Sequence, residues 1–476
     1  MTSAAPVVAP LAAHPLLIFL LQVSLLLLMA LALGRLAVRL GMPAVVGELC
    51  TGVLLGPSIL DHVVPALSGW LLPKDPTQFH LLDVIGQLGV LLLVGITGTE
   101  VDFALIRHRG ATAARISVAG FLIPLALGVG TGYLLPASLL AESSERTVFA
   151  LFLGVAMCVS AIPVIARTLM DMNLLHRNIG QLILSAGMVD DVFGWLMLSV
   201  VSAMATTGLR AGQVVLSLLY LAGVLVLAAL IGRPLVRAAL RLSARSVDPG
   251  PTVATAVILV LLGAAATHAL GLEAVFGAFI TGILIGSCAA VGSPAEPMAD
   301  NPGAVGKSAS RPRRIDLARL TPLRTVVLSV FAPVFFATAG LRMDLTALAK
   351  PTVLAVAVVV LLVAILGKFA GAYIGARASR LSQWEALALG AGMNARGVIE
   401  VVVAMVGLRL GVLSTAVYTI IVLVAVVTSL MAPPLLRLAM RRVDLTAEEE
   451  LRLHARGRPA GVTREVTISP ADESKA

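Results

Sequence analysis

Two adjacent aspartates, Asp190 and Asp191, lie near the middle of a long apolar segment at residues 178–204. An ionisable side chain within a bilayer is destabilising and by default marks a function. Two neighbouring carboxylates do not both ionise easily in a low dielectric, so at least one is expected to exchange protons near physiological pH. If this segment crosses a membrane, the pair suits a site that trades a proton for a cation. The structural alternative is that neighbouring bases neutralise both acids.

Two other apolar segments carry basic residues. Lys368, in ILGKFAGAY, is predicted to pair with an aspartate of segment 178–204. The alternative is a side chain that extends to the cytoplasmic interface. Arg396 and Glu400 are spaced i, i+4, which places them on one face of a helix. We interpret them as a structural ion pair.

Residues that interrupt a helix recur in two apolar segments. Pro163 follows Ser160 in MCVSAIPVIAR, and Asn394 and Gly397 lie in GAGMNARGVIE. Proline frees a backbone carbonyl, whereas asparagine and glycine permit non-helical dihedral angles. Unwound backbone at membrane depth is tolerated only where protein or a water-filled cavity satisfies it, so paired breaks indicate a transport site. At Pro163 the alternative is an ordinary kink, and the Ser160 hydroxyl either ligates a cation or caps the break.

The composition places these segments in a membrane. The chain has 476 residues, of which 58% are hydrophobic and 13% charged, whereas a soluble domain carries roughly 25% charged residues. A mean hydropathy of +0.99 excludes a single anchoring helix attached to a large soluble enzyme. Apolar runs of roughly 20 residues are typical of spanning helices, whereas barrel strands are short and alternating. The sequence therefore predicts an all-α polytopic membrane protein.

Windows of about 19 residues predict thirteen membrane spans. The spans lie near residues 15–40, 43–60, 82–99, 113–135, 147–170, 178–204, 214–236, 252–270, 274–291, 323–341, 352–375, 383–408 and 412–436. Most of the 35 basic residues fall in the loops on one side of this arrangement. By the positive-inside rule that side is the cytoplasm, so the N-terminus is expected outside and the C-terminus inside. The expected location is the cytoplasmic membrane of the cell.

The sequence contains an internal repeat. AVVGELCTGVLLG (residues 44–56) and AVFGAFITGILIG (residues 274–286) agree at seven of thirteen positions. The span after each copy carries a glycine with an aspartate four residues later, at Gly98 and at Gly340. The copies lie seven spans apart, and an odd offset inverts the second copy, as in alternating-access transporters. The alternative is two unrelated glycine-rich packing helices.

Other features exclude further classes of function. The three cysteines lie in apolar segments at unrelated spacings, which indicates neither a disulfide framework nor a metal site. His268 and Glu273 flank a short external turn and are interpreted as interfacial residues. The net charge of +9 follows the membrane topology, so nucleic acid is not an expected partner. The expected partners are membrane lipid, monovalent cations and protons, and no cofactor is expected.

The chain outside the spans is short and polar. Residues 1–441 are expected to form the transporter domain, with a polar, proline-rich linker near residues 292–320. Residues 442–476 are expected to form a short cytoplasmic tail. That tail is too short for a nucleotide-binding βαβ unit.

Eight blocks of the sequence resemble the monovalent cation:proton antiporter superfamily, in the branch of sodium/proton exchangers and potassium-efflux antiporters. The blocks are GMPAVVGELCTGVLLGPSIL, IGQLGVLLLVGITGTEVD, VSAIPVIARTLMDM, SAGMVDDVFGWL, FGAFITGILIG, APVFFATAGLRMDL, GKFAGAY and MNARGVIEVVVA. The resemblance implies a homodimer, with a dimerisation domain and a mobile core that contains two crossed broken helices. By position, dimerisation helices would span about 15–99 and 252–341, core helices about 113–204 and 352–436, and a linker helix 214–236. The glycine-rich second and ninth spans are expected to support the dimer by close packing.

The resemblance also suggests roles for single residues. Asp191 is similar to the invariant aspartate that carries the ion and the proton. Asp190 resembles the preceding variable position, which is acidic in electrogenic relatives. Lys368 matches a core lysine that pairs with this site in some relatives, and Ser160 lies by the first helix break. Potassium-efflux relatives often carry a fused nucleotide-binding domain, and its absence here puts that type of regulation in doubt.

Together these observations predict a secondary antiporter, and not an enzyme, that exchanges cytoplasmic Na⁺ or K⁺ for external protons by alternating access. Asp191 would bind the monovalent cation and protons in competition, Lys368 would stabilise ionised Asp190, and transport would be electrogenic. One alternative is a passive cation channel, which would not move protons against a cation gradient. The other is an intramembrane aspartyl protease, but such enzymes place their aspartates on separate helices, one of them in a GxGD context, whereas here GMV precedes an adjacent pair.

Overall fold

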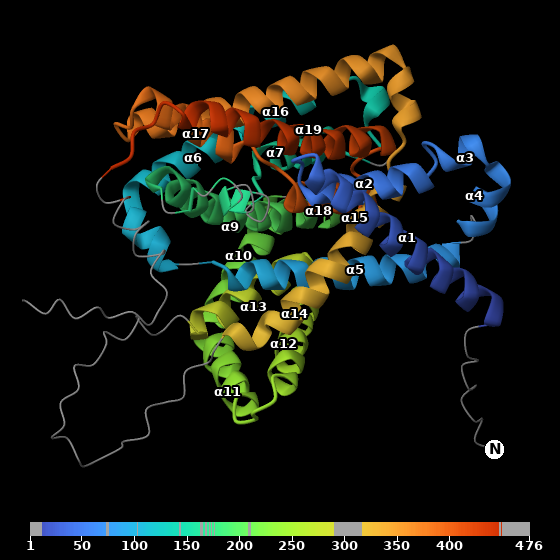
Figure 1. Ribbon diagram of the computed structural model, residues 1–476, viewed down its shortest axis with the longest axis horizontal. Helices are drawn as coiled ribbons and strands as arrows, with labels where there is room; N and C mark the ends of the chain where they lie inside the picture. The colour runs from blue at the N-terminus through green and yellow to red at the C-terminus, as the bar shows by residue number, and fades with distance from the viewer. Residues whose placement is uncertain are drawn as a thin grey trace, which may run out of the picture.

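The computed structural model describes most of the chain, and that part is built of helices (Figure 1). The described residues are 12–72, 76–101, 103–141, 144–161, 165–166, 169–170, 172, 174–175, 177–207, 211–289, 317–446 and 449. Asp102, Pro163, the linker at 290–316 and the tail from residue 450 lie outside them. Among the described residues, β-structure is limited to one isolated bridge, between Leu140 and Leu413.

The helices follow one another along the chain with short connections. The longer ones are α1 (Ala13–Arg39), α2 (Ala44–Leu55), α5 (Pro76–Thr99), α6 (Phe103–Leu134), α7 (Arg146–Cys158), α9 (Asn178–Thr207), α10 (Ala211–Leu227), α11 (Arg233–Ser243), α12 (Gly250–Ala269), α13 (Ala274–Ala289), α15 (Ala332–Leu341), α16 (Pro351–Ala378), α17 (Gln383–Met393), α18 (Val398–Arg409) and α19 (Thr415–Met440). Short helices are α3 (Leu60–Val63), α4 (Pro65–Leu71) and α14 (Thr321–Val326), with 3₁₀ turns at Ala137–Leu139, Leu317–Leu320 and Leu345–Ala349. Single π-helical turns at Ala228–Gly232 and Val327–Phe331 join α10 to α11 and α14 to α15.

The multi-pass membrane character predicted from composition is confirmed. Ten helical segments in the described part are long and apolar enough to cross a membrane, and the bent pair α17 and α18 is an eleventh candidate. The apolar helices α7 and α13 are shorter. Each of the thirteen expected spans contains helix, but the count of thirteen crossings stays a prediction.

The two copies of the repeat begin with the same turn. After α1 and α12 the chain passes through Gly41 and Gly271, whose φ angles are 76° and 74°. Positive φ is readily adopted only by a residue without a Cβ, which is why glycine ends so many helices. In both turns the next amide bonds back to the last helical turn, at 2.9 and 3.0 Å. The chain then reverses into α2 and into α13.

Corresponding glycines of the two copies make corresponding contacts. Gly52 of α2 packs against α15, where an added Cβ would lie 2.0 Å from the Ala337 carbonyl oxygen. Gly282, the matching residue of α13, packs against α5, where a Cβ would lie 2.0 Å from the Gly95 carbonyl oxygen. Each copy therefore packs its glycine helix on the following span of the other copy. These glycines are used inside one chain, so they lend no support to a dimer, contrary to the expectation from sequence.

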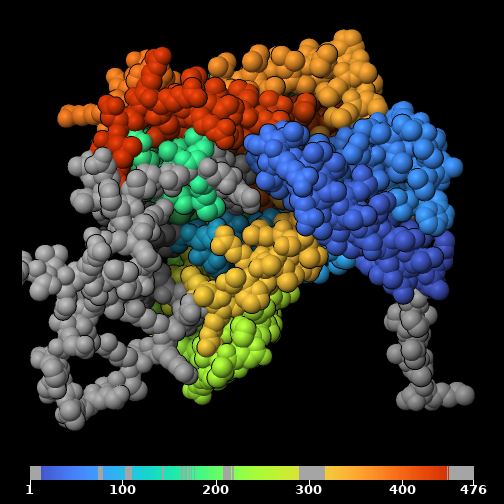
Figure 2. Space-filling view, viewed as in Figure 1, coloured from blue at the N-terminus to red at the C-terminus, as the bar shows by residue number. Residues whose placement is uncertain are grey.

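The helix that carries both aspartates, α9, is surrounded by other helices. It contacts α6, α7, α10, α13, α17 and α18. In Figure 1, α16, α17 and α19 lie along one edge of the molecule, α11 and α12 lie at the opposite edge, and α9 lies between them. On the face shown in Figure 2, the N-terminal helices (blue) lie beside the C-terminal helices (orange and red).

Candidate functional site

Asp190 is held by three polar side chains from three other elements. Its Oδ1 accepts a hydrogen bond from Ser117 Oγ of α6 at 2.6 Å. Its Oδ2 lies 2.5 Å from Lys368 Nζ of α16 and 3.1 Å from Ser160 Oγ. All four residues are buried. The acid is therefore both neutralised and hydrogen-bonded, which a buried carboxylate requires if it is to remain ionised.

Asp191, the next residue, has a different environment. It is fully buried, and neither carboxylate oxygen has a hydrogen-bond partner among the described residues. Asn394 is also fully buried, and both polar atoms of its amide lack a partner within the same part of the chain. Buried polar atoms are nearly always paired in folded proteins, so unpaired carboxylate and amide oxygens indicate a place for a ligand. Oxygen atoms are the ligands that hard cations prefer.

Two broken helices meet beside Asp190, whose Oδ2 contacts Ser160 at the first break. α7 ends at Cys158 and continues as extended backbone at Val159, and α17 ends just before Asn394. The chain is again non-helical at Gly397, and α18 leaves the break at 44° to α17. The breaks bond to each other, since Ala161 N donates to the Ala395 carbonyl at 3.1 Å. Ser160 Oγ lies 3.0 Å from the Met393 carbonyl. Pro163 lies outside the described residues, but the first break begins before it.

Two basic side chains bind the free carbonyls at the end of α7. Lys368 Nζ donates to the Cys158 carbonyl at 2.6 Å, and Arg396 Nη1 donates to the Ala156 carbonyl at 3.1 Å. The last carbonyls of a helix have no intrahelical partner and carry partial negative charge, so cations are favourable there. Lys368 therefore bridges the helix end and Asp190, and it is fully buried rather than extended to the interface.

Arg396 has more partners than the sequence suggested. Its contact with Glu400 is present, with Nη1 to Oε1 at 3.3 Å. Its Nη2 also donates to the Ala364 carbonyl of α16 at 2.9 Å, and its own carbonyl accepts from Ser429 Oγ of α19. Spacing along one helix predicts the pair with Glu400, whereas the carbonyl contacts depend on how helices cross.

Ser117 is a site residue that the sequence analysis did not single out. It lies in an apolar span, and helical serines of this kind usually bond their own backbone. Nothing in its local spacing distinguishes it from other serines in the chain. Only the packing of α6 against α9 brings its hydroxyl to Asp190.

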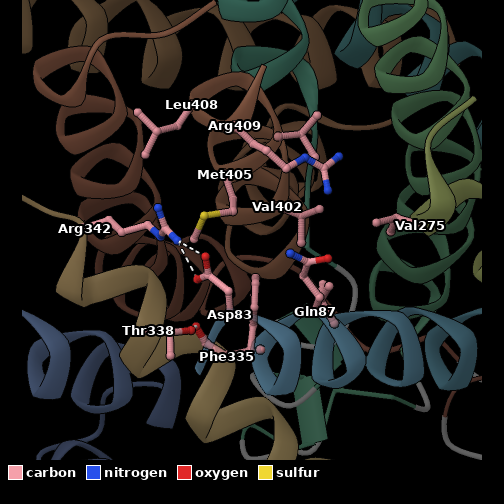
Figure 3. A pocket seen from close by; sticks show the side chains of 13 residues that line it. Asp83, Gln87, Val275, Phe335, Thr338, Arg342, Val402, Met405, Leu408 and Arg409 are labelled. Carbon is pink, nitrogen blue, oxygen red and sulfur yellow. Dashed lines mark hydrogen bonds and ion pairs between the residues drawn. The ribbon is translucent and has the colours of Figure 1, made fainter. Parts of the chain in front are cut away.

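A cavity of about 170 Å³ lies among α5, α13, α15 and α18 (Figure 3). Its polar lining includes Gln87 and an ion pair between Asp83 and Arg342, whose Nη2 lies 2.5 and 2.6 Å from the two carboxylate oxygens. Arg409 of α18 also lines the cavity and binds Glu273, with Nη2 to Oε2 at 2.8 Å. Glu273, which was interpreted as interfacial, thus connects the beginning of α13 to the end of α18.

Comparison with known proteins identifies the family. Residues 24–442 match the family described as "Sodium/hydrogen exchanger, transmembrane". The chain belongs to the sodium/hydrogen exchanger family. Members of this family are transporters, so this exchanger is a secondary antiporter and not an enzyme, and the protease alternative is excluded.

The relatives of this exchanger are named for different cations. It is 30% identical over 426 residues to the Na⁺/H⁺ antiporter NhaS4 of Synechocystis. This match covers 89% of this exchanger and 97% of NhaS4. The exchanger is 29% identical to cation/H⁺ antiporter 17 of Arabidopsis thaliana and 27% identical to K⁺/H⁺ antiporter 1 of Saccharomyces cerevisiae. Each of these two matches covers 89% of this exchanger but only 48% and 46% of the relative, so the chain spans about half their length.

A solved structure shows the same fold. The sodium proton antiporter MjNhaP1 of Methanocaldococcus jannaschii superposes with a TM-score of 0.62 at 17% identity. The match covers 90% of this exchanger and 99% of that chain. The fold predicted from the sequence is thus confirmed as that of an antiporter.

Proposed function

We propose that this exchanger moves a cytoplasmic monovalent cation, Na⁺ or K⁺, outward in exchange for external protons, and that Asp191 carries both. The observation that supports this role is the contrast between the two aspartates: Asp190 has three side-chain partners, whereas the Asp191 oxygens have none among the described residues. A carboxylate that is buried without a partner is stable when protonated or when a cation replaces the proton. One group can therefore serve both substrates in turn.

The cation would bind at the crossing of the two breaks. Asp191 supplies carboxylate oxygens, Asn394 supplies an amide oxygen, and Ser160 supplies a hydroxyl near the first break. The backbone of Gly397 is non-helical and adjoins the same crossing. Discontinuous helices place carbonyl oxygens and helix ends at transport sites of this kind.

Lys368 would make the exchange electrogenic. When Asp190 is ionised, the ammonium at 2.5 Å neutralises it. When both acids are protonated, two protons would be carried against one cation. When a cation occupies Asp191, Lys368 neutralises ionised Asp190. The cation-loaded core therefore does not carry an uncompensated second carboxylate through the low-dielectric barrier.

The division of the chain into moving parts follows the same proposal. The helices of residues 15–99 and 252–341 would form the dimerisation domain of a homodimer in the cytoplasmic membrane. The helices of residues 113–204 and 352–436 would form the core, with segment 214–236 as a linker. The N-terminus would lie outside, and the tail from residue 442 would lie in the cytoplasm.

Reconstitution into liposomes that contain a pH-sensitive dye tests the function. A proton gradient is imposed, and Na⁺, K⁺ or Li⁺ is then added in turn. We expect addition of the transported cation outside the liposomes to drive proton efflux, and the reversed cation gradient to drive proton uptake. A passive channel would instead give a cation conductance with no proton movement against the gradient, and that result would contradict antiport.

A further inference from the structure

The hydroxyl of Ser117 in α6 bonds to another helix instead of its own. Its Oγ lies 2.6 Å from Asp190 Oδ1, and both residues are fully buried. Thr131 of α6 and Ser185 of α9 each donate to the carbonyl four residues earlier, at 2.7 and 2.8 Å. Such a bond within the helix is the usual one for a helical serine or threonine. Ser117 forgoes it and spends its one hydroxyl hydrogen on the carboxylate of α9.

The two carboxylate oxygens of Asp190 have partners of different kinds. Oδ2 lies 2.5 Å from Lys368 Nζ and 3.1 Å from Ser160 Oγ. Oδ1 is bonded by Ser117, its one partner among the described residues. An ammonium group can only donate a hydrogen bond, whereas a hydroxyl group can donate one and accept one. Oδ1 is therefore the oxygen whose partner can respond when the carboxylate gains a proton.

A proton that binds to Asp190 is best placed on Oδ1. On Oδ2 its hydrogen would face the Lys368 ammonium, which has no lone pair to accept it. On Oδ1 its hydrogen faces the Ser117 oxygen, which accepts it once the serine hydroxyl turns away. The serine hydrogen can then bond to the carbonyl one turn earlier in α6. Ser117 keeps its own proton throughout, and only the direction of its hydrogen bond reverses.

Ser160 does not take the place of Ser117. Its single hydroxyl hydrogen has two acceptors within reach, the Met393 carbonyl at 3.0 Å and Asp190 Oδ2 at 3.1 Å. It also shares Oδ2 with Lys368, so a proton that faced Ser160 from that oxygen would lie against the ammonium. The response to protonation therefore falls to Ser117.

We infer that Ser117 is the positioning residue for the second proton of the exchange, because its hydroxyl donates to ionised Asp190 and accepts from protonated Asp190. The inference rests on the proposed two-proton cycle. The proton comes from external water and leaves to the cytoplasm when a cation binds at Asp191. Lys368 keeps its bond to the Cys158 carbonyl in both forms, since the end of α7 favours a cation.

Ionisable groups from several elements surround the two aspartates and Lys368. They are Glu100 after α5, Cys158 at the end of α7, and Arg396 and Glu400 at the second break. Ser117 carries no charge, so its replacement leaves this set of charges intact. A change in the protonation of Asp190 on replacement of Ser117 is therefore an effect of the hydrogen bond.

Difference infrared spectroscopy of the full chain tests the inference without transport. A protonated carboxyl group absorbs at a different frequency from a carboxylate, and the signal that is lost in Asp190→Asn belongs to Asp190. Every sample carries Asp191→Asn, so that the neighbouring acid does not titrate. We expect the Asp190 signal to appear as pH falls, with a midpoint about one pH unit higher in Ser117→Ala. The lost hydrogen bond is stronger to the ionised acid than to the protonated acid, so its removal favours the proton.

Two variants serve as controls for this shift. Ser117→Thr keeps the hydroxyl and should stay within about 0.3 pH unit of the parent midpoint. Ser185→Ala removes a buried hydroxyl that bonds its own helix, and it should also leave the midpoint in place. If Ser117→Ala does not fold, Ser117→Cys replaces it, because a thiol is a weak donor and a weak acceptor. An unchanged midpoint in the folded variant, or an equal shift in Ser185→Ala, overturns the inference.

The charge moved per cycle gives a second measurement. At a pH between the two midpoints, Asp190 of Ser117→Ala stays protonated more often when the cation binds, so fewer second protons are exchanged. Its transport rate should respond less to the membrane potential than that of Ser117→Thr, and an equal response contradicts the inference. If the Asp190 signal is absent from about pH 5 to 9, the inference and the two-proton cycle are both wrong. Transport by Asp191→Asn decides separately whether Asp191 is the carrier.

Discussion

Lys368 Nζ lies 2.5 Å from Asp190 Oδ2, and neither side chain is exposed to solvent. The same ammonium donates to the Cys158 carbonyl at the end of α7. Asp190 therefore has a fixed counter-charge, whereas Asp191 has no partner among the described residues. Two adjacent acids on one helix thus occupy unlike environments, and this difference assigns them unlike tasks in the proposed cycle.

The first prediction concerns Asp191. Asp191→Asn should abolish exchange of every cation, because an amide neither releases a proton nor carries a charge to offset that of the cation. Asparagine is nearly isosteric with aspartate and removes a buried unpaired acid, so the variant should fold at least as well as the parent. Size-exclusion profiles check folding, and dye-loaded liposomes check transport. Retained exchange would mean that another group carries the ions.

The second prediction concerns the interlocked repeat. Gly282→Ala should lower stability by about 1–3 kcal/mol, because overpacking forces helices apart, and its Cβ would lie 2.0 Å from the backbone of α5. Gly130→Ala in α6 is the matched control, since an added Cβ meets nothing within 4 Å there. Thermal unfolding in detergent compares the two. Equal melting temperatures for both variants would contradict the close contact of α13 with α5.

Much of this architecture is predictable from sequence, because it depends on local patterns. Apolar runs give the spans, glycine spacing gives the repeat, and the charges at Asp190 and Lys368 stand out in apolar surroundings. Contacts between helices depend instead on tilt and rotation. Spacing therefore could not show that Ser117 reaches Asp190 or that Trp195 packs on Phe279.

The third prediction concerns Arg396, which joins α7, α16 and α18 through one guanidinium. Arg396→Lys keeps the charge but cannot reach all three acceptors, so it should lower stability by about 1–3 kcal/mol. Arg377→Lys is the control, because Arg377 is exposed and donates to one carbonyl, that of Leu381. Thermal unfolding should show a clear loss for the first variant and little change for the second. Equal losses would leave Arg396 with no special structural role.

The fourth prediction concerns the tail at the start of α9. Glu449 accepts hydrogen bonds from Thr446 N and Asn178 N and pairs with Arg177 Nε at 3.3 Å. Burial opposes its ionisation, but these donors and the guanidinium hold the pKa of Glu449 below its ordinary value of 4.5. A lowered pKa in the folded state stabilises the docked tail above that value, and the effect is lost as pH falls through the lowered pKa. The stability of the contact between Glu449 and the start of α9 should therefore be constant from about pH 6 to 8.

Glu449→Gln should loosen this contact throughout the range from about pH 6 to 8, where Glu449 is ionised. The loss of charge should weaken local structure by about 1 kcal/mol, which makes hydrogen exchange of the Asn178 amide about fivefold faster. Glu385→Gln, in the capping box of α17, is the control and should leave that amide unchanged. If the hydrogen-exchange rate of the Asn178 amide changed between pH 6 and 8, after correction for the intrinsic rate, a group other than Glu449 would control docking of the tail.

The last prediction concerns charge per cycle. If Asp190 and Asp191 both take protons on the outer side and lose both when one cation binds inside, two positive charges enter for each one that leaves. Each net charge would couple transport to the membrane potential at about 2.3 kcal/mol per 100 mV. If Asp190 and Lys368 instead stay paired throughout, Asp191 alone swaps one proton for one cation, and transport is electroneutral.

A potassium diffusion potential set by valinomycin, with Na⁺ as substrate, distinguishes these cycles. We expect the parent rate to depend on the potential. Asp190→Asn should remove that dependence, but it leaves a buried ammonium without its carboxylate and so lowers stability by about 3–5 kcal/mol. The double variant Asp190→Asn with Lys368→Gln removes both charges, and any exchange it retains should ignore the potential. A parent rate that ignores the potential would contradict the two-proton cycle, and a double variant that still responds would assign the second proton to a group other than Asp190.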